Sequence, residues 1–297
     1  MSVERASGPD PMISVVMPAR NSAHVIAGQL AALDAQLYDG PWEIIVADNG
    51  STDGTAGVAR RWADRLPALQ VVDAGERIGI NAARNAGARR AAGRFLLFCD
   101  ADDEADPGWL AAMADAARTC SAVGGTLEKQ TLNDPTVVEW RPPLVMTELP
   151  VMAGFLPRPV GANCGVRAEL WRQLGGFNEE YTVGATETEF FWRLQLAGHD
   201  VCFVPDAVMH YRFRPGLPAH ARQFFRFGVA RARLYRDFRT AGMPPRMFRA
   251  LLRDVGWLCG HLPDLFRGRG PRGRWIGHAA AEWGRVVGSI RYRLVYL

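Results

Sequence analysis

The sequence lacks several features, and each absence excludes a class of protein. It contains no uninterrupted apolar run of about 18 residues, so we expect no membrane-spanning helix. Residues 1–25 do not show the charged, apolar and small-residue order of a signal peptide. The five cysteines are scattered and odd in number, which fits neither a zinc site nor a disulfide framework. A reducing cytoplasm is therefore the expected compartment.

Two glycine-rich phosphate-binding motifs are also missing. The first predicted strand is followed by Pro18-Ala19-Arg20-Asn21, where a dinucleotide-binding loop would need G-x-G-x-x-G. Lys129 is the only lysine of the chain and lacks the glycine frame of a Walker A loop. A nucleotide bound to this chain would therefore need another group, such as a metal ion, to hold its phosphates.

Charged residues are unevenly divided along the chain, although the net charge is only +4. The segment from Arg212 onward contains 18 arginines and 4 acidic residues, which gives +14, whereas residues 1–211 carry −10. One interpretation is that the basic segment contacts anions such as membrane headgroups or lipid phosphates. The alternative is compositional, because arginine serves as the general cation of this chain and an arginine-rich helix often packs with one face in solvent.

Short apolar runs alternate with helical patterns over the first two thirds of the sequence. Strands are predicted at residues 13–17, 42–47, 69–72, 94–99, 122–126, 137–140, 163–166 and 201–204. Helices are predicted at residues 22–36, 55–66, 80–92, 107–120, 168–174 and 188–197. This alternation is typical of an α/β fold with a mostly parallel sheet flanked by helices.

The two ends of the chain differ from this α/β domain, which we place at residues 12–214. Residues 1–11 are predicted to form a loose leader, and residues 215–297 a basic helical extension. The extension begins with an amphipathic helix and continues with helices near residues 244–266 and 274–292. A basic loop at residues 267–274 is expected between the last two helices.

One stretch combines a buried strand with a cluster of carboxylates. The apolar run Phe95-Leu96-Leu97-Phe98-Cys99 ends in Asp100, Asp102 and Asp103. In open α/β sheets, ligands bind beyond the carboxyl ends of strands, and carboxylate oxygens are the ligands that hard cations prefer. Carboxylates without a partner are costly at such a position. The sequence therefore predicts a site for Mg²⁺ or Mn²⁺ and a phosphate group.

For some acidic residues the pattern favours a local structural role. Asp106 precedes a proline, as an N-cap residue does, and Glu104 would favour the dipole of the same helix. Asp53 is assigned to the turn and N-cap before the helix at residue 55. Asp48 fits either a binding residue or an Asx turn beside Gly50.

Several motifs follow one another in a particular order. They are VVMPARN at residues 15–21, VADNGSTDGT at 46–55, ARNAG at 83–87, DADD at 100–103, GGFNE at 175–179, WRL at 192–194, and PDAV at 205–208 followed by His210. In this order they resemble the family 2 glycosyltransferases of the GT-A fold, over about residues 12–212. The resemblance implies a GT-A type sheet with a C-terminal helical extension.

The resemblance also implies a role for each matching residue. The residues implied to bind the nucleotide sugar are Pro18, Ala19, Arg20, Asp48, Arg84, Asp100 and Ala101. Residues 18–20 would line the nucleobase pocket, and Asp48 would hydrogen-bond the base. Asp100 would contact ribose or the metal shell, Asp102 would ligate the metal, and His210 matches a position linked to the diphosphate or the metal.

The activity implied is metal-dependent transfer of a sugar, with inversion of its anomeric centre, to an acceptor hydroxyl or amine. Mg²⁺ or Mn²⁺ would be the cofactor, and a UDP-sugar the first choice of donor, with dTDP- and GDP-sugars as alternatives. The acceptor would be a glycan, a lipid-linked molecule or a small molecule, and no nucleic acid is expected. The location would be cytoplasmic, with the arginine-rich helices on the inner face of the membrane. A noncatalytic binding or scaffold protein and a nucleotidyltransferase are the alternatives.

One segment departs from the family pattern. Inverting members usually carry a Glu-Asp pair before the helix with the Trp-Arg motif, and the aspartate is the proposed base. Here Thr186 replaces the glutamate, and Glu187, whose carboxylate extends one methylene further, replaces the aspartate. We predict Glu187 as the base, because its intrinsic pKa resembles that of aspartate. The alternative is that Thr186 caps the helix and that Glu187 and Glu189 are acids of its first turn.

Overall fold

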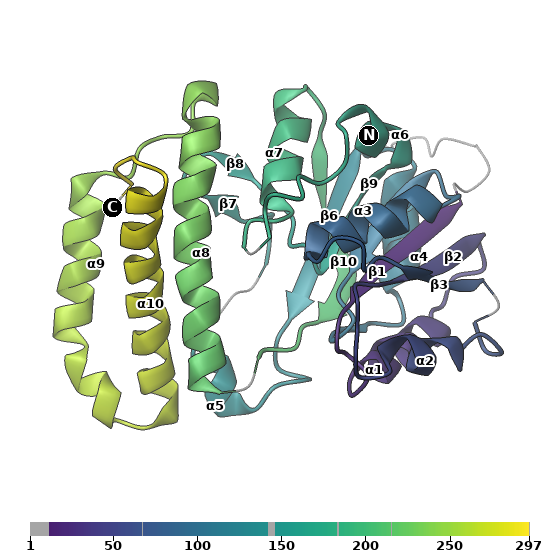
Figure 1. Ribbon diagram of the computed structural model, residues 1–297, viewed down its shortest axis with the longest axis horizontal. Coiled ribbons are helices and arrows are strands. Elements are labelled where there is room, and N and C mark those ends of the chain that lie inside the picture. Colours follow the sequence, from purple (N-terminus) through teal and green to yellow (C-terminus); the bar gives the residue numbers. More distant parts are fainter. Residues whose placement is uncertain (1–11, 67, 142–145, 183, 215, 297) are drawn as a thin grey trace, which may run out of the picture.

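A computed structural model describes residues 12–66, 68–141, 146–182, 184–214 and 216–296. Its centre is an eight-stranded sheet with the strand order β3-β2-β1-β4-β9-β6-β10-β5 (Figure 1). The strands are β1 (Ile13–Ala19), β2 (Trp42–Asp48), β3 (Leu69–Asp73), β4 (Phe95–Cys99), β5 (Glu104–Ala105), β6 (Ala122–Glu128), β9 (Asn163–Arg167) and β10 (Val201–His210). Only β5 and β9 of these strands run against the others. The predicted mostly parallel α/β sheet is therefore confirmed.

Helices cover both faces of the sheet, and the sequence of each strand explains why. One face carries α1 (Ile26–Asp34), α2 (Thr55–Arg60) and α4 (Trp109–Ala117), and the other carries α3 (Ile80–Arg90), α6 (Ala168–Gln173) and α7 (Thr188–Leu196). Successive side chains of a strand point to opposite faces. In β1, Ile13, Val15 and Met17 lie in the first core and Val16 lies in the second. Strands with two apolar faces are thus buried between two layers of helices.

The C-terminal segment forms helices that stand side by side, with α8 nearest to the sheet (Figure 1). They are α8 (Leu217–Phe238), α9 (Phe248–Gly260) and α10 (Arg269–Arg291), with the short 3₁₀ helices η1 (Arg239–Ala241) and η2 (Leu262–Phe266). Gly228 of α8 lies so close to α10 that a Cβ atom would come within 2.1 Å of the carbonyl oxygen of Ala281. Small residues therefore set the spacing between α8 and α10.

A third hydrophobic core joins α8 to the rest of the protein. Trp192 of α7 packs edge-on against Phe238 of α8, with ring centroids 5.2 Å apart. Phe155 contacts the same tryptophan from the hairpin of β7 (Val151–Met152) and β8 (Leu156–Pro157). The amphipathic helix predicted from residue 215 onward thus packs on the protein with its apolar side. The domain boundary at residue 214 stays a prediction.

The predicted strand at residues 137–140 is wrong, because α5 (Pro135–Val138) is a short helix. Asp134 is its N-cap residue and accepts a hydrogen bond from the backbone N–H of Thr136 at 2.8 Å. Pro135 occupies the first turn, where its missing N–H costs nothing. The Asp-Pro pair was a helix-start signal that the β-branched residues after it obscured.

Two strands contain a proline and run past their predicted ends at residues 17 and 204. Pro18 lies inside β1, two residues beyond the last pair of the β1–β4 ladder, which is Val16 opposite Phe98. Pro205 lies in β10 at a bulge, since the register with β6 shifts between Val204 and Val208. Bulges and ladder ends are positions where a strand tolerates proline. Both strands are therefore longer than predicted.

The basic loop predicted at residues 267–274 is mostly helix. Helix α10 already begins at Arg269, and Pro271 lies in its first turn. Gly273 faces Trp140 of the main domain, and a Cβ atom there would come within 2.3 Å of its ring. Gly273 is therefore required by close packing.

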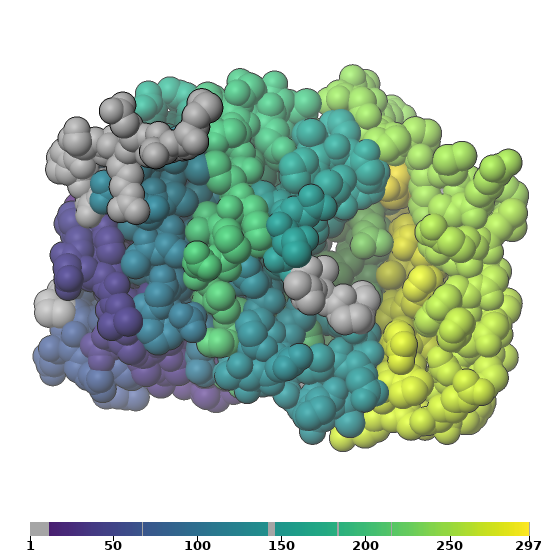
Figure 2. Space-filling view, turned by 180° about the vertical axis from the view of Figure 1, so that it is seen from behind, coloured from purple at the N-terminus to yellow at the C-terminus, as the bar shows by residue number. Residues whose placement is uncertain are grey.

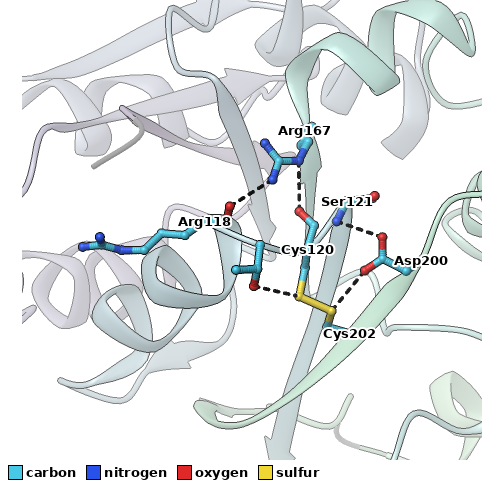
Figure 3. The surroundings of a disulfide bond; sticks show 7 residues. Arg118, Cys120, Ser121, Arg167, Asp200 and Cys202 are labelled. Carbon is cyan, nitrogen blue, oxygen red and sulfur yellow. Dashed lines mark hydrogen bonds between the residues drawn. A yellow bond between two sulfur atoms is a disulfide. The ribbon is translucent and has the colours of Figure 1, made fainter. Parts of the chain in front are cut away.

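A disulfide corrects the expectation drawn from the cysteines. Cys120, just before β6, is bonded to Cys202 in β10 (Figure 3). The two strands are parallel neighbours with Cys202 opposite Val123, so cysteines 82 residues apart in sequence become adjacent. The remaining cysteines are free: Cys99, Cys164 and Cys259. Disulfides are typical of oxidising compartments, so the cysteines no longer favour a reducing cytoplasm.

None of the helices in the described ranges combines the length and the apolar character that crossing a bilayer requires.

Candidate active site

Three parallel strands bring the predicted donor-binding residues to one edge of the sheet. Ala19 at the end of β1 pairs with Asp48 at the end of β2, and β4 runs beside β1 in the same direction. Asp48 accepts a weak hydrogen bond from the backbone N–H of Ser51, at 3.3 Å, through Oδ1. Pro18 and Ala19 are buried, whereas Arg20 is exposed. This contact spans three residues, whereas the side chain in an Asx turn bonds to the N–H two residues on, so the predicted Asx turn beside Gly50 is not what the structure shows. The side chain of Asp48 still has acceptor capacity for a ligand.

The acidic loop after β4 gathers three carboxylates. Ligand oxygens of Asp100, Asp102 and Asp103 all lie within 4.8 Å of one another. Burial, followed by repulsion from Asp100, raises the pKa of Asp102 to about 6. Burial, followed by repulsion from Asp100 and Asp102, raises the pKa of Asp103 well above its usual value. Burial also raises the pKa of Asp100, while Arg84 opposes this shift. Without a cation, these negative charges destabilise one another.

The donor set of this loop fits a divalent metal ion. Carboxylate oxygens are the ligands of hard cations such as Mg²⁺. Oδ2 of Asp103 is buried without a hydrogen-bond partner in the described part of the chain. Its Oδ1 accepts the backbone N–H of Arg212 at 2.7 Å, which fixes the orientation of the carboxylate. An oriented acceptor without a donor is what a missing cation would leave behind.

Arg212 holds the acidic loop, and the sequence interpretation did not include it. Its Nε donates to the carbonyl oxygen of Asp102 at 2.8 Å, and its Nη2 donates to Oε1 of Glu104 at 3.1 Å. Together with the backbone contact to Asp103, it ties β10 to three successive acidic residues. Its position two residues after His210 was the only sequence signal.

Arg84 is the central cation of the site and is only 2% exposed. Its Nη2 donates to the carbonyl oxygen of Gly161 at 3.1 Å and lies 3.4 Å from Oδ1 of Asp100. Its Nη1 donates to Oγ1 of Thr186 at 3.3 Å. A buried guanidinium with several acceptors is rigidly placed, and here it joins β4 to the segment before α7.

Glu187 lies at the other end of this network. Its Oε2 accepts the hydroxyl of Thr186 at 2.9 Å, and its Oε1 accepts Nη1 of Arg158 at 2.9 Å. Thr186 in turn accepts from Arg84. A series of hydrogen bonds therefore leads from Asp100 through Arg84 and Thr186 to Glu187. Nothing in the sequence pattern indicated the contact with Arg158.

The alternative interpretation of Thr186 as a helix cap is wrong. Glu187 occupies the N-cap position of α7, and its side chain makes no capping hydrogen bond. Glu189 pairs with Arg193 one turn later, with Nε and Oε1 2.7 Å apart. The hydroxyl of Thr186 is therefore used to position Glu187 and Arg84.

His210 is not part of the group of three aspartates, as far as the described residues show. It is the last residue of β10, and its Nδ1 lies 2.9 Å from Oε2 of Glu128. Its Nε2 is 3.9 Å from Oδ2 of Asp106. Its role as a metal ligand stays a prediction, and Glu128 is a partner that the sequence did not reveal.

The structural roles assigned to nearby acids hold only in part. Asp106 is not the N-cap residue of α4, which is Gly108, although its side chain accepts the N–H of Gly108 at 3.1 Å. Asp53 is confirmed as a turn residue, since it accepts the N–H of Thr55 at 3.1 Å, but the N-cap residue of α2 is Gly54. Glu104 is not a cap, because it lies in β5 and pairs with Arg212.

Comparison with known proteins decides the family. The profile described as Glycosyl transferase family 2 matches residues 14–169, more than half of the chain. The chain belongs to this family. The resemblance stated from the motifs is thereby confirmed, and this family 2 protein is a glycosyltransferase.

Two curated relatives of this glycosyltransferase cover most of its length. Glycosyltransferase AglE of Haloferax volcanii is 28% identical over 210 residues, which are 69% of this chain and 68% of the relative. Succinoglycan biosynthesis protein ExoA of Rhizobium meliloti is 26% identical over 261 residues, or 82% and 79% of the two chains.

Solved structures show the same fold as this glycosyltransferase. Mannosyltransferase PcManGT from Pyrobaculum calidifontis, in complex with GDP-Man and Mn²⁺, superposes with a TM-score of 0.63 over 95% of this chain and 89% of that one, at 22% identity. S. aureus TarS in complex with UDP gives a TM-score of 0.57 over 96% and 93%, at 18% identity. The predicted GT-A fold with C-terminal helices is confirmed.

Proposed function

We propose that this glycosyltransferase is metal-dependent and inverting, and that it transfers a sugar from a nucleoside diphosphate sugar to an acceptor hydroxyl or amine. The observation that carries this proposal is the series of hydrogen bonds from the acidic loop to Glu187. A metal-binding group and a base must lie at fixed positions on either side of the reacting carbon. Arg84 and Thr186 provide such a rigid connection.

The donor would bind at the carboxyl edge of β1, β2 and β4. Residues 18–20 would line the nucleobase pocket, Asp48 would hydrogen-bond the base, and Ala101 would lie against the sugar nucleotide. A UDP-sugar is the first choice, with dTDP- and GDP-sugars as alternatives. The structures of the two similar enzymes contain GDP-Man and UDP, which supports a nucleotide-sugar donor of this kind.

Asp102 would ligate Mg²⁺ or Mn²⁺, which would offset the charge that develops on the leaving diphosphate. Asp100 would lie in the metal shell or on the ribose, and His210 would approach the diphosphate from the end of β10. Arg84 holds Asp100 in position. Arg212 holds the backbone of the loop, so that the three carboxylates face the same space.

Glu187 would act as the base. The acceptor oxygen or nitrogen attacks the anomeric carbon as its bond to the diphosphate oxygen breaks, and the acceptor proton moves to a carboxylate oxygen of Glu187. Arg158 and Thr186 each occupy one oxygen of that carboxylate, so its orientation is fixed. General base catalysis of this kind contributes about 10²–10⁴-fold in rate.

The test is product analysis with purified enzyme, a panel of nucleoside diphosphate sugars, Mn²⁺, and glycan or lipid-linked acceptors. We expect a free nucleoside diphosphate and a glycosylated acceptor whose anomeric centre is inverted, as read by proton NMR coupling constants. Release of pyrophosphate would instead show nucleotidyl transfer. A folded protein that binds a donor but never turns it over would show a noncatalytic binding protein.

We also propose that the C-terminal helices contact an anionic membrane surface. An exposed stripe runs along α9 and η2 with helical spacing, formed by Phe248, Leu252, Val255, Leu262 and Phe266. Phe266 is 83% exposed. Exposed arginines lie beside the stripe, for example Arg249 and Arg253. Apolar and cationic side chains on one helix surface match a bilayer interface with anionic headgroups.

The membrane proposal is tested by vesicle sedimentation. Vesicles with phosphatidylglycerol should bind the protein at low salt, and binding should weaken as salt rises. Leu252→Asp should reduce binding, whereas Leu37→Asp, at a leucine of the main domain that is even more exposed, should not. No binding at low salt would contradict the proposal. Because the inner leaflet is rich in anionic lipids, the proposed location is the cytoplasmic face of a membrane. In that reducing compartment Cys120 and Cys202 would be expected in the dithiol form, so this location predicts that the bond is reduced there.

A further inference from the structure

A cavity of about 370 Å³ lies between the C-terminal helices and the β7–β8 hairpin, away from the acidic loop. Its walls come from α8, α9, α10, the hairpin and the chain near the C-terminus. The polar residues of the lining are Arg231, Arg246, Arg253, Asp254, Arg285 and Tyr296. The space-filling view shows the surface hollowed between the teal segment that includes residues 146–160 and the light green and yellow helices (Figure 2).

Positive charge exceeds negative charge around this cavity. Arg246 contacts Asp254 through Nη2, and its Nη1 lies 3.1 Å from Oε2 of Glu282. Arg285 contacts the same glutamate at 2.6 Å, and Arg253 contacts Asp254 at 3.1 Å. Two carboxylates therefore serve three of the four arginines. Counted over the described residues, about two positive charges of the cavity remain uncompensated.

Arg231 is the arginine without a partner. It is half-buried on α8, and no hydrogen bond or ion pair of its guanidinium is found in the described residues. Nε of Arg285 is also buried without an acceptor. Guanidinium groups in such places normally find acceptors, because an unpaired buried charge is costly. Both side chains line the same cavity.

We propose that this cavity binds a phosphate group, as a phosphate monoester or a diphosphate, through Arg231 and Arg285. An anion with two negative charges would compensate the excess charge, and guanidinium groups match phosphate oxygens in paired hydrogen bonds. Burial raises the pKa of Tyr296, so its hydroxyl stays protonated and can donate as well. The volume is sufficient for a phosphate group and the atoms attached to it.

The cavity is electrostatically linked to the candidate base. Arg158, which holds Glu187, is among the charges that act on Arg231. A phosphate bound at Arg231 would reduce the repulsion between these two arginines. The proposal itself does not rest on the proposed transfer reaction, because the site is tested by binding alone.

The probes are inorganic phosphate and pyrophosphate, added to the full-length protein in the presence of EDTA so that no divalent metal serves the acidic loop. Calorimetry and thermal shift are measured for the wild type, Arg231→Gln and Arg226→Gln. The last variant is the matched control, since Arg226 is exposed on the same helix and is not part of the cavity. A third arm compares vesicles with phosphatidic acid, a monoester, and vesicles with phosphatidylglycerol, a diester.

We expect Arg231→Gln to lose at least tenfold in phosphate affinity and Arg226→Gln to keep it. Without phosphate, Arg231→Gln should melt at the same or a higher temperature, because its guanidinium has no partner to lose. Binding of the free anions would identify a soluble phosphate, and a preference for phosphatidic acid that only Arg231→Gln abolishes would identify a lipid-borne one. The proposal is overturned if the wild type binds no probe or if Arg231→Gln binds as the wild type does. Asp102→Asn should not alter phosphate binding, which separates this site from the donor site.

Discussion

Replacing Glu187 by glutamine tests the proposed base with the smallest structural change. The amide keeps the shape of the side chain, and its oxygen can still accept the Nη1 hydrogen of Arg158. The hydroxyl of Thr186 can rotate and accept from the amide NH₂ group. What the variant loses is the ability to take a proton. We therefore expect the fold and donor binding to persist while the chemical step slows.

The expected loss follows from the role of the residue. A general base is worth about 10²–10⁴-fold in rate, or roughly 3–5 kcal/mol of transition-state stabilisation. Glu187→Asp keeps the base but moves the carboxylate by about 1 Å and away from Arg158, which should cost about 10²-fold. The two variants thus separate proton transfer from positioning.

The assay is single-turnover sugar transfer with saturating donor, together with calorimetric titration of the nucleoside diphosphate. The reasoning requires Glu187→Gln to lower kcat and leave nucleotide affinity within about twofold of the wild type. Turnover of Glu187→Gln within a few-fold of the wild type would refute the assignment of the base. A loss of nucleotide affinity with normal kcat would show that Glu187 serves binding instead.

Three further outcomes are expected. Asp102→Asn should abolish Mn²⁺-activated turnover, by roughly 10²-fold or more, because a metal contributes several kcal/mol at a developing anion; normal metal activation would refute this. Burial lowers the pKa of His220 to about 4 from 6.5. The unfolded chain therefore gains a proton first as pH falls, and stability should drop by about 2 kcal/mol between pH 7 and pH 5 in urea titrations, a drop that His220→Gln should lack. Reduction, or Cys202→Ser, should lower stability by up to roughly 4 kcal/mol, because the disulfide closes a loop of 82 residues. Cys259→Ser, at an exposed free cysteine, should change nothing.

Much of the sheet could be predicted because its signals are local. The side chains of residues 95–99 point alternately into the two hydrophobic cores, which is why both faces of this strand are apolar. The turn into Asp100 follows the last residue of the strand and therefore lies at the carboxyl edge of the sheet. Parallel pairing then fixes Asp48 beside the end of β1. These features follow from periodicity and from the direction of the strands. The order of β9 and β6 in the sheet could not be derived in this way, because it depends on packing between segments that are distant in the sequence.

The network around Arg84 could not be derived from the sequence. Gly161 and Thr186 lie far from Arg84 along the chain and meet it only after β9 and α7 have packed on the sheet. The contact between Arg158 and Glu187 is likewise nonlocal. A motif places a residue on an element, but the partners of a buried charge are set by the tertiary structure.

The wrong predictions have two physical causes. The helix at residues 135–138 is specified locally by the Asp134 cap and Pro135, a signal that the β-branched residues after it outweighed in the prediction. At residues 267–274 the helix depends on contacts with another part of the chain, such as Trp140 beside Gly273. The disulfide between Cys120 and Cys202 also depends on two strands becoming neighbours. Local propensity is overridden where packing requires it.

The central claim is that the edge formed by Asp48 and the acidic loop binds a nucleoside diphosphate through a metal. The most direct measurement is calorimetric titration of the protein with UDP, GDP and dTDP, each with and without Mn²⁺. We predict that one of the three binds, UDP first, and that its affinity falls strongly when Mn²⁺ is omitted or when Asp102 is replaced by asparagine. If a well-folded protein binds none of the three, or binds equally well without metal, the account of the donor site is wrong.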